Sequence, residues 1–282
     1  MSSELASFYK RAAVTLWVED IHTRLYLEEL WQSQQIGYLI GGGRDTIQAV
    51  TEDAYRSGVP IVFGLCDRDF GRTNVHRWQV MDDSERVYRL PRVEVENYLL
   101  DAIALAACKW NTAPRSPTEI DARMQSCVEE SAWWLATRRA LHGLSRENVD
   151  GFPSDPRARH ISSLSDAIAY VTSSRWATST VHGMSGKVSS PAIAARLEEE
   201  HAAVTASLVD GTWRETCSGK EVFAQVDSYV WTRGRRSDSK AELARAVAIE
   251  QVRAGRVPPD LDRLRVALLD RLNRSLALLE PR

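Results

Sequence analysis

Acidic residues that could bind metal ions follow directly after apolar segments of the chain. Glu19 ends the run AAVTLWV, Asp67 and Asp69 end the run VPIVFGLC, and Glu94 and Glu96 follow a short apolar segment. Carboxylates that gather at one place repel each other unless a cation lies among them, and such hard oxygen ligands suit Mg²⁺ or Mn²⁺. A lone Asp-x-Asp is better explained by solvated loop acids, so the case for a metal site depends on the fold around it.

Apolar runs and helical patterns alternate through the first hundred residues. Unbroken apolar runs favour strands that are buried on both faces, as in a parallel sheet. We expect strands at residues 12–18, 36–40, 59–66 and 87–90, with helices at 21–34, 45–57 and 95–108. This order predicts an α/β fold in which helices flank a parallel sheet. Ligands bind outside the carboxyl ends of such strands, which is where the acidic residues lie.

After residue 110 the pattern becomes mostly helical. A segment rich in Pro, Ser and Thr at residues 111–119 is typical of a linker, so we expect two domains, 1–110 and 111–282. Helices are expected at residues 120–141, 191–208, 240–254 and 261–279. Leucines recur every three or four residues in the last of these, which predicts an amphipathic face for packing in the core or in a dimer.

Composition excludes several classes of protein. Hydrophobic residues make up 44% and charged residues 26% of the 282 residues, which is typical of a folded globular chain. No apolar run approaches the ~18 residues that a membrane helix needs, and no cleavable signal pattern is present, so we expect a cytoplasmic protein. The four cysteines have no CxxC spacing and the histidines no HExxH, which argues against zinc. The net charge of −2 gives no sign of a nucleic-acid partner.

Four segments nevertheless resemble, in order, one family of nucleic-acid enzymes. LWVED at residues 16–20 and GLCDRDF at 64–70 resemble the two halves of a TOPRIM domain, which has a glutamate after its first strand and a DxD after its third. RVEVENYLL at residues 92–100 and CSGKEVF at 217–223 resemble segments of stand-alone TOPRIM proteins. These proteins are related to the OLD nucleases, and the toxin subunit of the PARIS anti-phage system belongs to the same group.

The resemblance implies a role for each matching residue. It implies that the metal ligands are Glu19, Asp67, Asp69, Glu94 and Glu96. Glu19 would also act as general acid or base, and Lys220 would stabilise charge on the phosphate. Two Mg²⁺ or Mn²⁺ ions can orient the attacking water and stabilise both oxygens of an in-line displacement. A lysine adds fixed positive charge where the phosphoryl oxygens become more negative.

Several of these assignments have a simpler structural alternative. Glu94 and Glu96 also fit the acidic first turn of a helix, where the helix dipole favours them. Lys220 also fits an exposed position in a Ser-Gly turn. The sequence GMSGK at residues 183–187 lacks the spacing of a phosphate-binding loop, so we expect no ATPase site in this chain. The resemblance implies that a partner ATPase would supply that activity.

Arginines near aromatic residues are candidates for nucleic-acid binding. Arg233, Arg235 and Arg236 lie close to a tyrosine and a tryptophan, and Arg138 and Arg139 form a second cluster. Basic groups among aromatic residues suit single strands or loops, where bases stack and phosphates pair with cations. Each cluster taken alone is better explained as a solvated surface.

Together these features predict a Mg²⁺-dependent TOPRIM nuclease that cleaves phosphodiester bonds in RNA or DNA, as an anti-phage defence or toxin effector. The expected partners are tRNA or DNA, a partner ATPase and a second copy in a homodimer, with no membrane association. The alternative is a non-nuclease TOPRIM scaffold or binding module that acts by assembly with a partner ATPase. Bound cations would reverse the negative charge of the acidic cluster, so we expect poor nucleic-acid binding without divalent metal.

Overall fold

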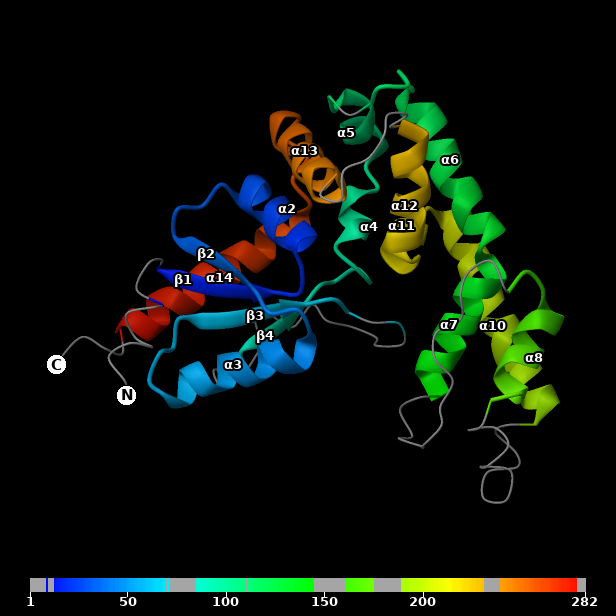
Figure 1. Ribbon diagram of the computed structural model, residues 1–282, viewed down its shortest axis with the longest axis horizontal. Coiled ribbons are helices and arrows are strands. Elements are labelled where there is room, and N and C mark those ends of the chain that lie inside the picture. The colour runs from blue at the N-terminus through cyan, green and yellow to red at the C-terminus, as the bar shows by residue number, and fades with distance from the viewer. Residues whose placement is uncertain are drawn as a thin grey trace.

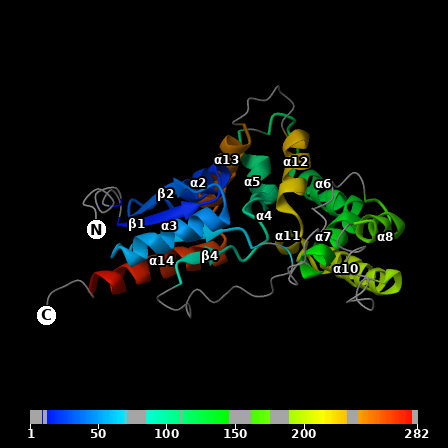
Figure 2. The same cartoon turned by 60° about the horizontal axis from the view of Figure 1, so that its bottom comes forward.

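The computed structural model consists of an α/β part and an arm of helices that projects from it (Figure 1). The two are joined by a short helical connection, which lies between them in both cartoon views (Figure 2). The structure describes residues 9, 13–68, 70, 85–109, 111–144, 161–174, 189–230 and 239–277.

Four parallel strands form one sheet in the order β2-β1-β3-β4. The strands are β1 (Val14–Val18), β2 (Ile36–Ile40), β3 (Val62–Cys66) and β4 (Val87–Arg89). In the register of the sheet, Leu16 of β1 pairs with Tyr38 of β2 on one side and with Phe63 of β3 on the other. The predicted parallel α/β arrangement is therefore confirmed. β3 begins later than expected, at Val62.

Helices cover both faces of the sheet. α2 (Ile21–Trp31) and α14 (Pro259–Ala277) lie on one face, and α3 (Arg44–Arg56) lies on the other (Figure 1). Successive side chains of a strand point to opposite faces, so Leu16 is buried in the main core with α2 and α14 whereas Trp17 faces the smaller cluster beside α3. Of the predicted leucine face of α14, the leucines whose side chains are described pack in this main core, namely Leu261, Leu264, Leu268 and Leu272.

The regular structure of the arm is all helical within its described residues, as predicted for the second half of the chain. Its helices are α6 (Pro117–Glu130), α7 (Ala132–Leu144), α8 (Leu164–Thr172), α10 (Ser190–Asp210), α11 (Trp213–Thr216) and α12 (Gly219–Val230). The chain then returns to the α/β part, where α13 (Ser239–Arg253) packs on α2. Within the described ranges, no helix combines the length and apolarity that crossing a membrane would require.

Two expected helices are each divided into two. The segment expected as one helix at residues 95–108 forms α4 (Glu96–Leu99) and α5 (Ala102–Ala107), because Asp101 has an extended backbone and caps α5 by accepting from the backbone of Ile103 and Ala104. The helix expected at residues 120–141 is interrupted at Ser131, whose hydroxyl donates to the carbonyl of Cys127 (2.6 Å).

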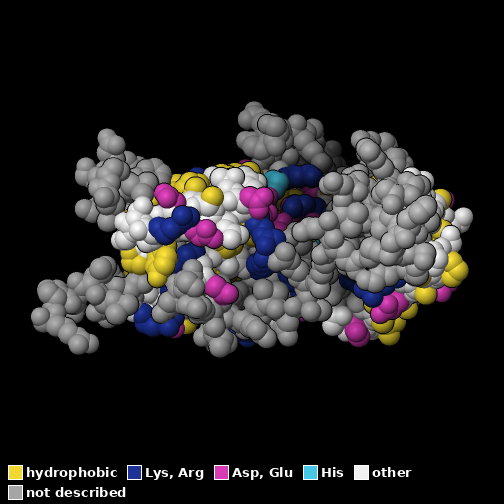
Figure 3. Space-filling model, turned by 90° about the horizontal axis from the view of Figure 1, so that it is seen from below, with side chains coloured by type: hydrophobic (Ala, Val, Ile, Leu, Met, Phe, Trp, Pro, Cys, Tyr) yellow, Lys and Arg dark blue, Asp and Glu magenta, His cyan; other side chains and the backbone are white. Residues whose placement is uncertain are grey.

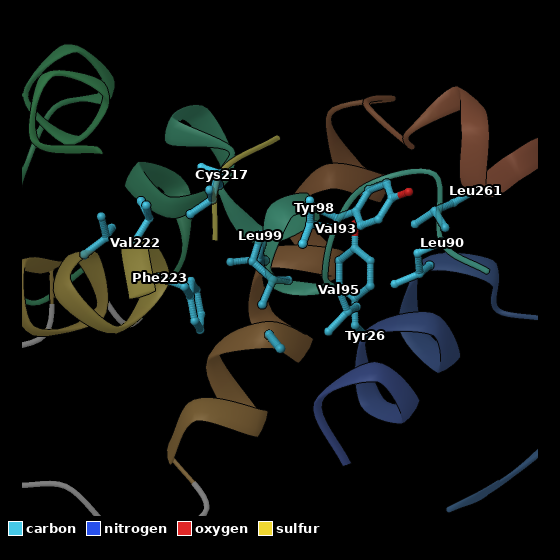
Figure 4. Close-up of a cluster of buried hydrophobic side chains, with 14 of the residues drawn as sticks. Tyr26, Leu90, Val93, Val95, Tyr98, Leu99, Cys217, Val222, Phe223 and Leu261 are labelled. Carbon is cyan, nitrogen blue, oxygen red and sulfur yellow. The ribbon is translucent and has the colours of Figure 1, made fainter. Parts of the chain in front are cut away.

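A second part of the main core joins the arm to the sheet. Figure 4 shows side chains of the segment before α4 meeting others from α2, α12 and α14, among them Tyr26, Phe223 and Leu261. Val93 and Val95 are almost fully buried in this cluster. Glu94 and Glu96, which alternate with them, are also buried, and their partners described below lie at the carboxyl end of the sheet.

Gly64 allows α3 to approach the sheet closely. A Cβ atom at Gly64 would lie 2.3 Å from Cγ2 of Ile47 and 3.2 Å from Cγ2 of Val87. Because Ile47 is a stiff β-branched side chain buried under α3, it cannot move aside without shifting the helix.

We expect Gly64→Ala to lower the free energy of unfolding by about 1–3 kcal/mol, the usual cost of overpacking a core. Urea denaturation would measure it. Ile47→Ala in the same chain removes the obstructing methyl group, so the double variant should lose less stability than the sum of the two single variants. Gly43→Ser is the control, because a Cβ atom added at Gly43 would have no neighbouring atom within 4 Å. Gly43 is the N-cap of α3, and serine is a preferred N-cap residue. Strict additivity would contradict the steric explanation.

Candidate active site

Carboxylates from two strand ends meet at the carboxyl edge of the sheet. Asp67 directly follows β3, and the segment that follows β4 runs beside it. The N–H of Arg68 donates to the carbonyl of Val93 (3.0 Å), and the N–H of Val95 donates to Oδ1 of Asp67 (3.3 Å). These contacts bring Glu94 close enough to raise the pKa of Asp67.

Lys220 reaches the same carboxylates from the distant helix α12. Its Nζ lies 3.0 Å from Oδ2 of Asp67, and its backbone N–H donates to Oε2 of Glu94 (2.8 Å). The hydroxyl of Ser218 donates to the same oxygen of Glu94 (3.3 Å). The structure therefore brings together three of the residues that the resemblance singled out. Lys220 lies in the first turn of a helix rather than in an isolated Ser-Gly turn.

Asn97 joins the carboxylate segment to the start of α12. Its Oδ1 accepts from the backbone N–H of Glu94 (2.8 Å), and its Nδ2 donates to the carbonyls of Arg214 (2.9 Å) and Cys217 (3.1 Å). A Cβ on Gly219 would lie 2.5 Å from the backbone nitrogen of Asn97, so glycine permits this close approach. Asn97 thereby fixes the distance between Glu94 and Lys220.

Glu19 belongs to the same group of charges. It follows β1, the strand beside β3, and its backbone carbonyl accepts from the N–H of Gly42 (3.1 Å). Burial is the main cause of a raised pKa of the Cys66 thiol, and the charge of Glu19 raises it further. Burial is also the main cause of the raised pKa of Asp67, to which Glu19 again adds. The charge of Glu19 therefore acts directly on the end of β3.

A histidine that the sequence analysis did not select lies beside Glu96. Nδ1 of His22 is 3.8 Å from Oε1 of Glu96 and 3.9 Å from Oδ2 of Asp20. These three residues offer ligand atoms that all lie within 4.8 Å of one another. Burial lowers the pKa of His22, which favours the neutral imidazole that binds metals. Asp20 also caps α2 by accepting from the backbone of Thr23 (2.8 Å), so its position has a structural cause as well.

The carboxylates of this site are buried without enough positive charge around them. Burial, with the charges of Glu19 and Glu94, raises the pKa of Asp67 to about 7 despite the opposing Lys220. Burial also raises the pKa of Glu96 to about 8, and its Oε2 has no hydrogen-bond partner among the described residues. Burial alone would lower the pKa of Lys220, but Asp67, Glu96 and Glu94 together raise it, so the lysine stays charged. A divalent cation would satisfy these oxygens, and their chemistry fits Mg²⁺ or Mn²⁺.

Four of the predicted residues lie outside the described ranges. These are Asp69, Arg233, Arg235 and Arg236. The assignments made for them therefore stay predictions.

The fold and the site cannot be assigned to a family by comparison with known proteins. No family model matches the chain, and neither the curated proteins nor the solved structures include a match.

Because the pKa of Glu96 is raised, we expect the free energy of unfolding of the metal-free protein to depend on pH. A folded pKa of about 8 against an ordinary 4.5 means that the folded chain keeps a proton that the unfolded chain releases between these values. The contribution of this group to stability is therefore complete below about pH 4.5 and is lost as the pH rises to 8.

We expect the free energy of unfolding of Glu96→Gln to rise relative to that of the wild-type protein as the pH is raised from 5 to 8 in EDTA. The difference should grow by at most about 1.4 kcal/mol per pH unit. Denaturant titrations at several pH values would measure this difference. Glu130→Gln, at an exposed site on α6, should show no such change between pH 6 and 8. A constant difference for Glu96→Gln would show that its carboxyl titrates normally.

Asn97 provides a separate test of how the site is held together. Asn97→Ala removes hydrogen bonds to three backbone groups, two of them buried and one partly buried, so we expect the free energy of unfolding to fall by about 2–4 kcal/mol. Asn111→Ala is a matched control, since its amide bonds only to nearby backbone at residues 106 and 115. Equal losses in the two variants would contradict a special role for Asn97.

Proposed function

We propose that this protein is a metal-dependent nuclease of the TOPRIM type that hydrolyses phosphodiester bonds in nucleic acid. The observation that carries the proposal is the meeting of Asp67, Glu94 and Glu96 with Lys220 at the carboxyl end of a parallel sheet. Acidic oxygens beside one lysine suit a reaction in which cations and an ammonium group share a phosphate. The order of the four sequence segments that resemble TOPRIM proteins supports the same assignment.

The residues of the site have distinct parts in this proposal. Glu19 and Asp67 would hold one cation, and Glu96 would hold a second together with Asp20 and His22. Bound cations supply Lewis acidity toward the phosphate oxygens and toward water. Lys220, held in its charged form by the surrounding carboxylates, donates to a phosphate oxygen as that oxygen gains charge.

The bonds and protons of the reaction balance with water as the only co-reactant. The oxygen of water forms a bond to phosphorus while the bond from phosphorus to the leaving sugar oxygen breaks. The attacking water gives a proton to Glu19 as general base. The leaving oxygen takes a proton from solvent, and Glu19 returns its proton to solvent, so one water is consumed for each bond that is cleaved.

The proposal predicts metal-dependent cleavage that is lost on changing the carboxylates. Purified protein would be incubated with tRNA, single-stranded DNA and duplex DNA in Mg²⁺ or Mn²⁺, and the products separated on denaturing gels. We expect cleavage with metal, none with EDTA, and a loss of about 10²–10³-fold or more for Glu19→Ala, Asp67→Asn and Lys220→Ala.

Glu198→Gln is the matched control, because it neutralises an exposed carboxylate on α10 in the arm. It should cleave at the original rate. Full activity in both Glu19→Ala and Asp67→Asn would overturn the site. Absence of cleavage for every substrate and metal would favour the scaffold alternative instead.

A further inference from the structure

Two arginines from distant parts of the chain hold the same turn next to the acidic site. Nη2 of Arg68, which follows β3, donates to the carbonyl of Glu215 (3.2 Å). Nη2 of Arg139, on α7, donates to the next carbonyl along the chain, that of Thr216 (2.6 Å). The two guanidinium groups are therefore anchored on consecutive residues of α11.

Neither guanidinium has a counter-ion in contact. Among the described residues, no carboxylate oxygen lies within 4.0 Å of a guanidinium nitrogen of Arg68 or Arg139, and Nε of Arg68 is buried without a hydrogen bond. Arg214 on the same turn differs, because it forms an ion pair with Asp121. Both side chains are half-buried, and a charge taken partly out of water without a counter-ion carries a desolvation cost, so this arrangement requires another reason.

The two arginines also act on each other. Burial is the main cause of a lowered pKa in both, and the charge of Arg68 lowers the pKa of Arg139 further. Glu215 near Arg68 and Glu200 near Arg139 oppose these effects without forming an ion pair with either arginine. Two like charges are thus held close together where an anion between them would relieve their repulsion.

Positive charge continues from this pair toward the carboxylates. Arg138, beside Arg139 on α7, donates from Nη1 to the hydroxyl of Ser218 (3.3 Å), and that hydroxyl donates to Glu94. Figure 3 shows Lys and Arg side chains gathered in a hollow between the α/β part and the arm, next to acidic side chains and a histidine. An anion held at this hollow would lie beside the candidate active site.

We propose that Arg68 and Arg139 bind a phosphate group of a nucleic-acid chain, next to the phosphate that is cleaved. The placement of this phosphate next to the one that is cleaved rests on the proposed nuclease function. The planar fork of a guanidinium group matches phosphate oxygens, and two such forks can bind one phosphate from both sides. The binding residues contribute to affinity and leave the acid–base chemistry to the carboxylates.

The first experiment measures binding without cleavage. A fluorescently labelled single-stranded oligonucleotide would be titrated with protein in Ca²⁺, and the anisotropy followed at several salt concentrations. We expect Arg68→Gln and Arg139→Gln each to weaken binding about tenfold and to reduce the slope of log affinity against log salt by about one. Arg24→Gln on α2 is the control for net charge, since Arg24 is paired with Glu28 in its own helix.

A second measurement distinguishes phosphate binding by the two arginines from a purely structural role, in which they only hold α11 in place. Inorganic phosphate should raise the melting temperature of the original protein and of Arg24→Gln but leave that of Arg139→Gln unchanged. An oligonucleotide with a 5′-phosphate and one with a 5′-hydroxyl would distinguish a terminal phosphate from a backbone phosphate. Equal affinity for both oligonucleotides supports the proposal, and strict dependence on the 5′-phosphate overturns the choice of a backbone phosphate.

The proposal fails if both glutamine variants bind the oligonucleotide as the original protein does, or if phosphate stabilises Arg139→Gln equally. These outcomes are independent of nuclease activity, because no readout requires cleavage. Arginine-dependent binding without cleavage would overturn only the proposed nuclease function. Cleavage with unchanged binding in the arginine variants would overturn only the phosphate site.

Discussion

The buried amide of Asn97 is the interaction on which the candidate site depends. One end of this side chain accepts from the backbone of Glu94, and the other donates to the carbonyls of Arg214 in α11 and of Cys217 just after it. The amide therefore sets the segment after β4 against the turn that begins α12, and Gly219 lets the two backbones come together. Without this contact, the lysine and the carboxylates would be joined only by their own hydrogen bonds and ion pair and by that of Ser218, among the described residues.

Charge in this region is arranged in two neighbouring groups. Among the described residues, the carboxylates at the strand ends have one lysine, Lys220, in an ion pair with them, whereas Arg68 and Arg139 beside α11 are half-buried and have no carboxylate oxygen within 4.0 Å. Such groups would cancel if they paired directly, and the structure instead anchors the two arginines on backbone carbonyls. Under the proposed function, keeping the two kinds of charge apart would allow cations and a phosphate chain to bind side by side.

The sequence was sufficient for the sheet and for selecting Asp67, Glu94 and Lys220, which meet at one edge of it. Apolar runs that end in acidic residues marked β1 and β3, because strands buried on both faces leave a clear signal. The break between α4 and α5 was missed because the capping of Asp101 competes with a continuous apolar pattern. His22 and Asn97 were missed because a lone polar residue carries no spacing signal, and its partners are defined only when distant segments meet. Arg68 was overlooked inside the DRD segment for the same reason.

The order of these segments along the chain has a consequence for synthesis. The carboxylates come from the first hundred residues, Lys220 comes from the last third, and α14 provides one cover of the sheet. Domains form as units during translation only when all their packing surfaces have left the ribosome. The nascent chain therefore carries the acidic residues long before it can bury the sheet that aligns them. The site is assembled only when the C-terminal helices arrive, so a ribosome-bound fragment would lack the complete centre.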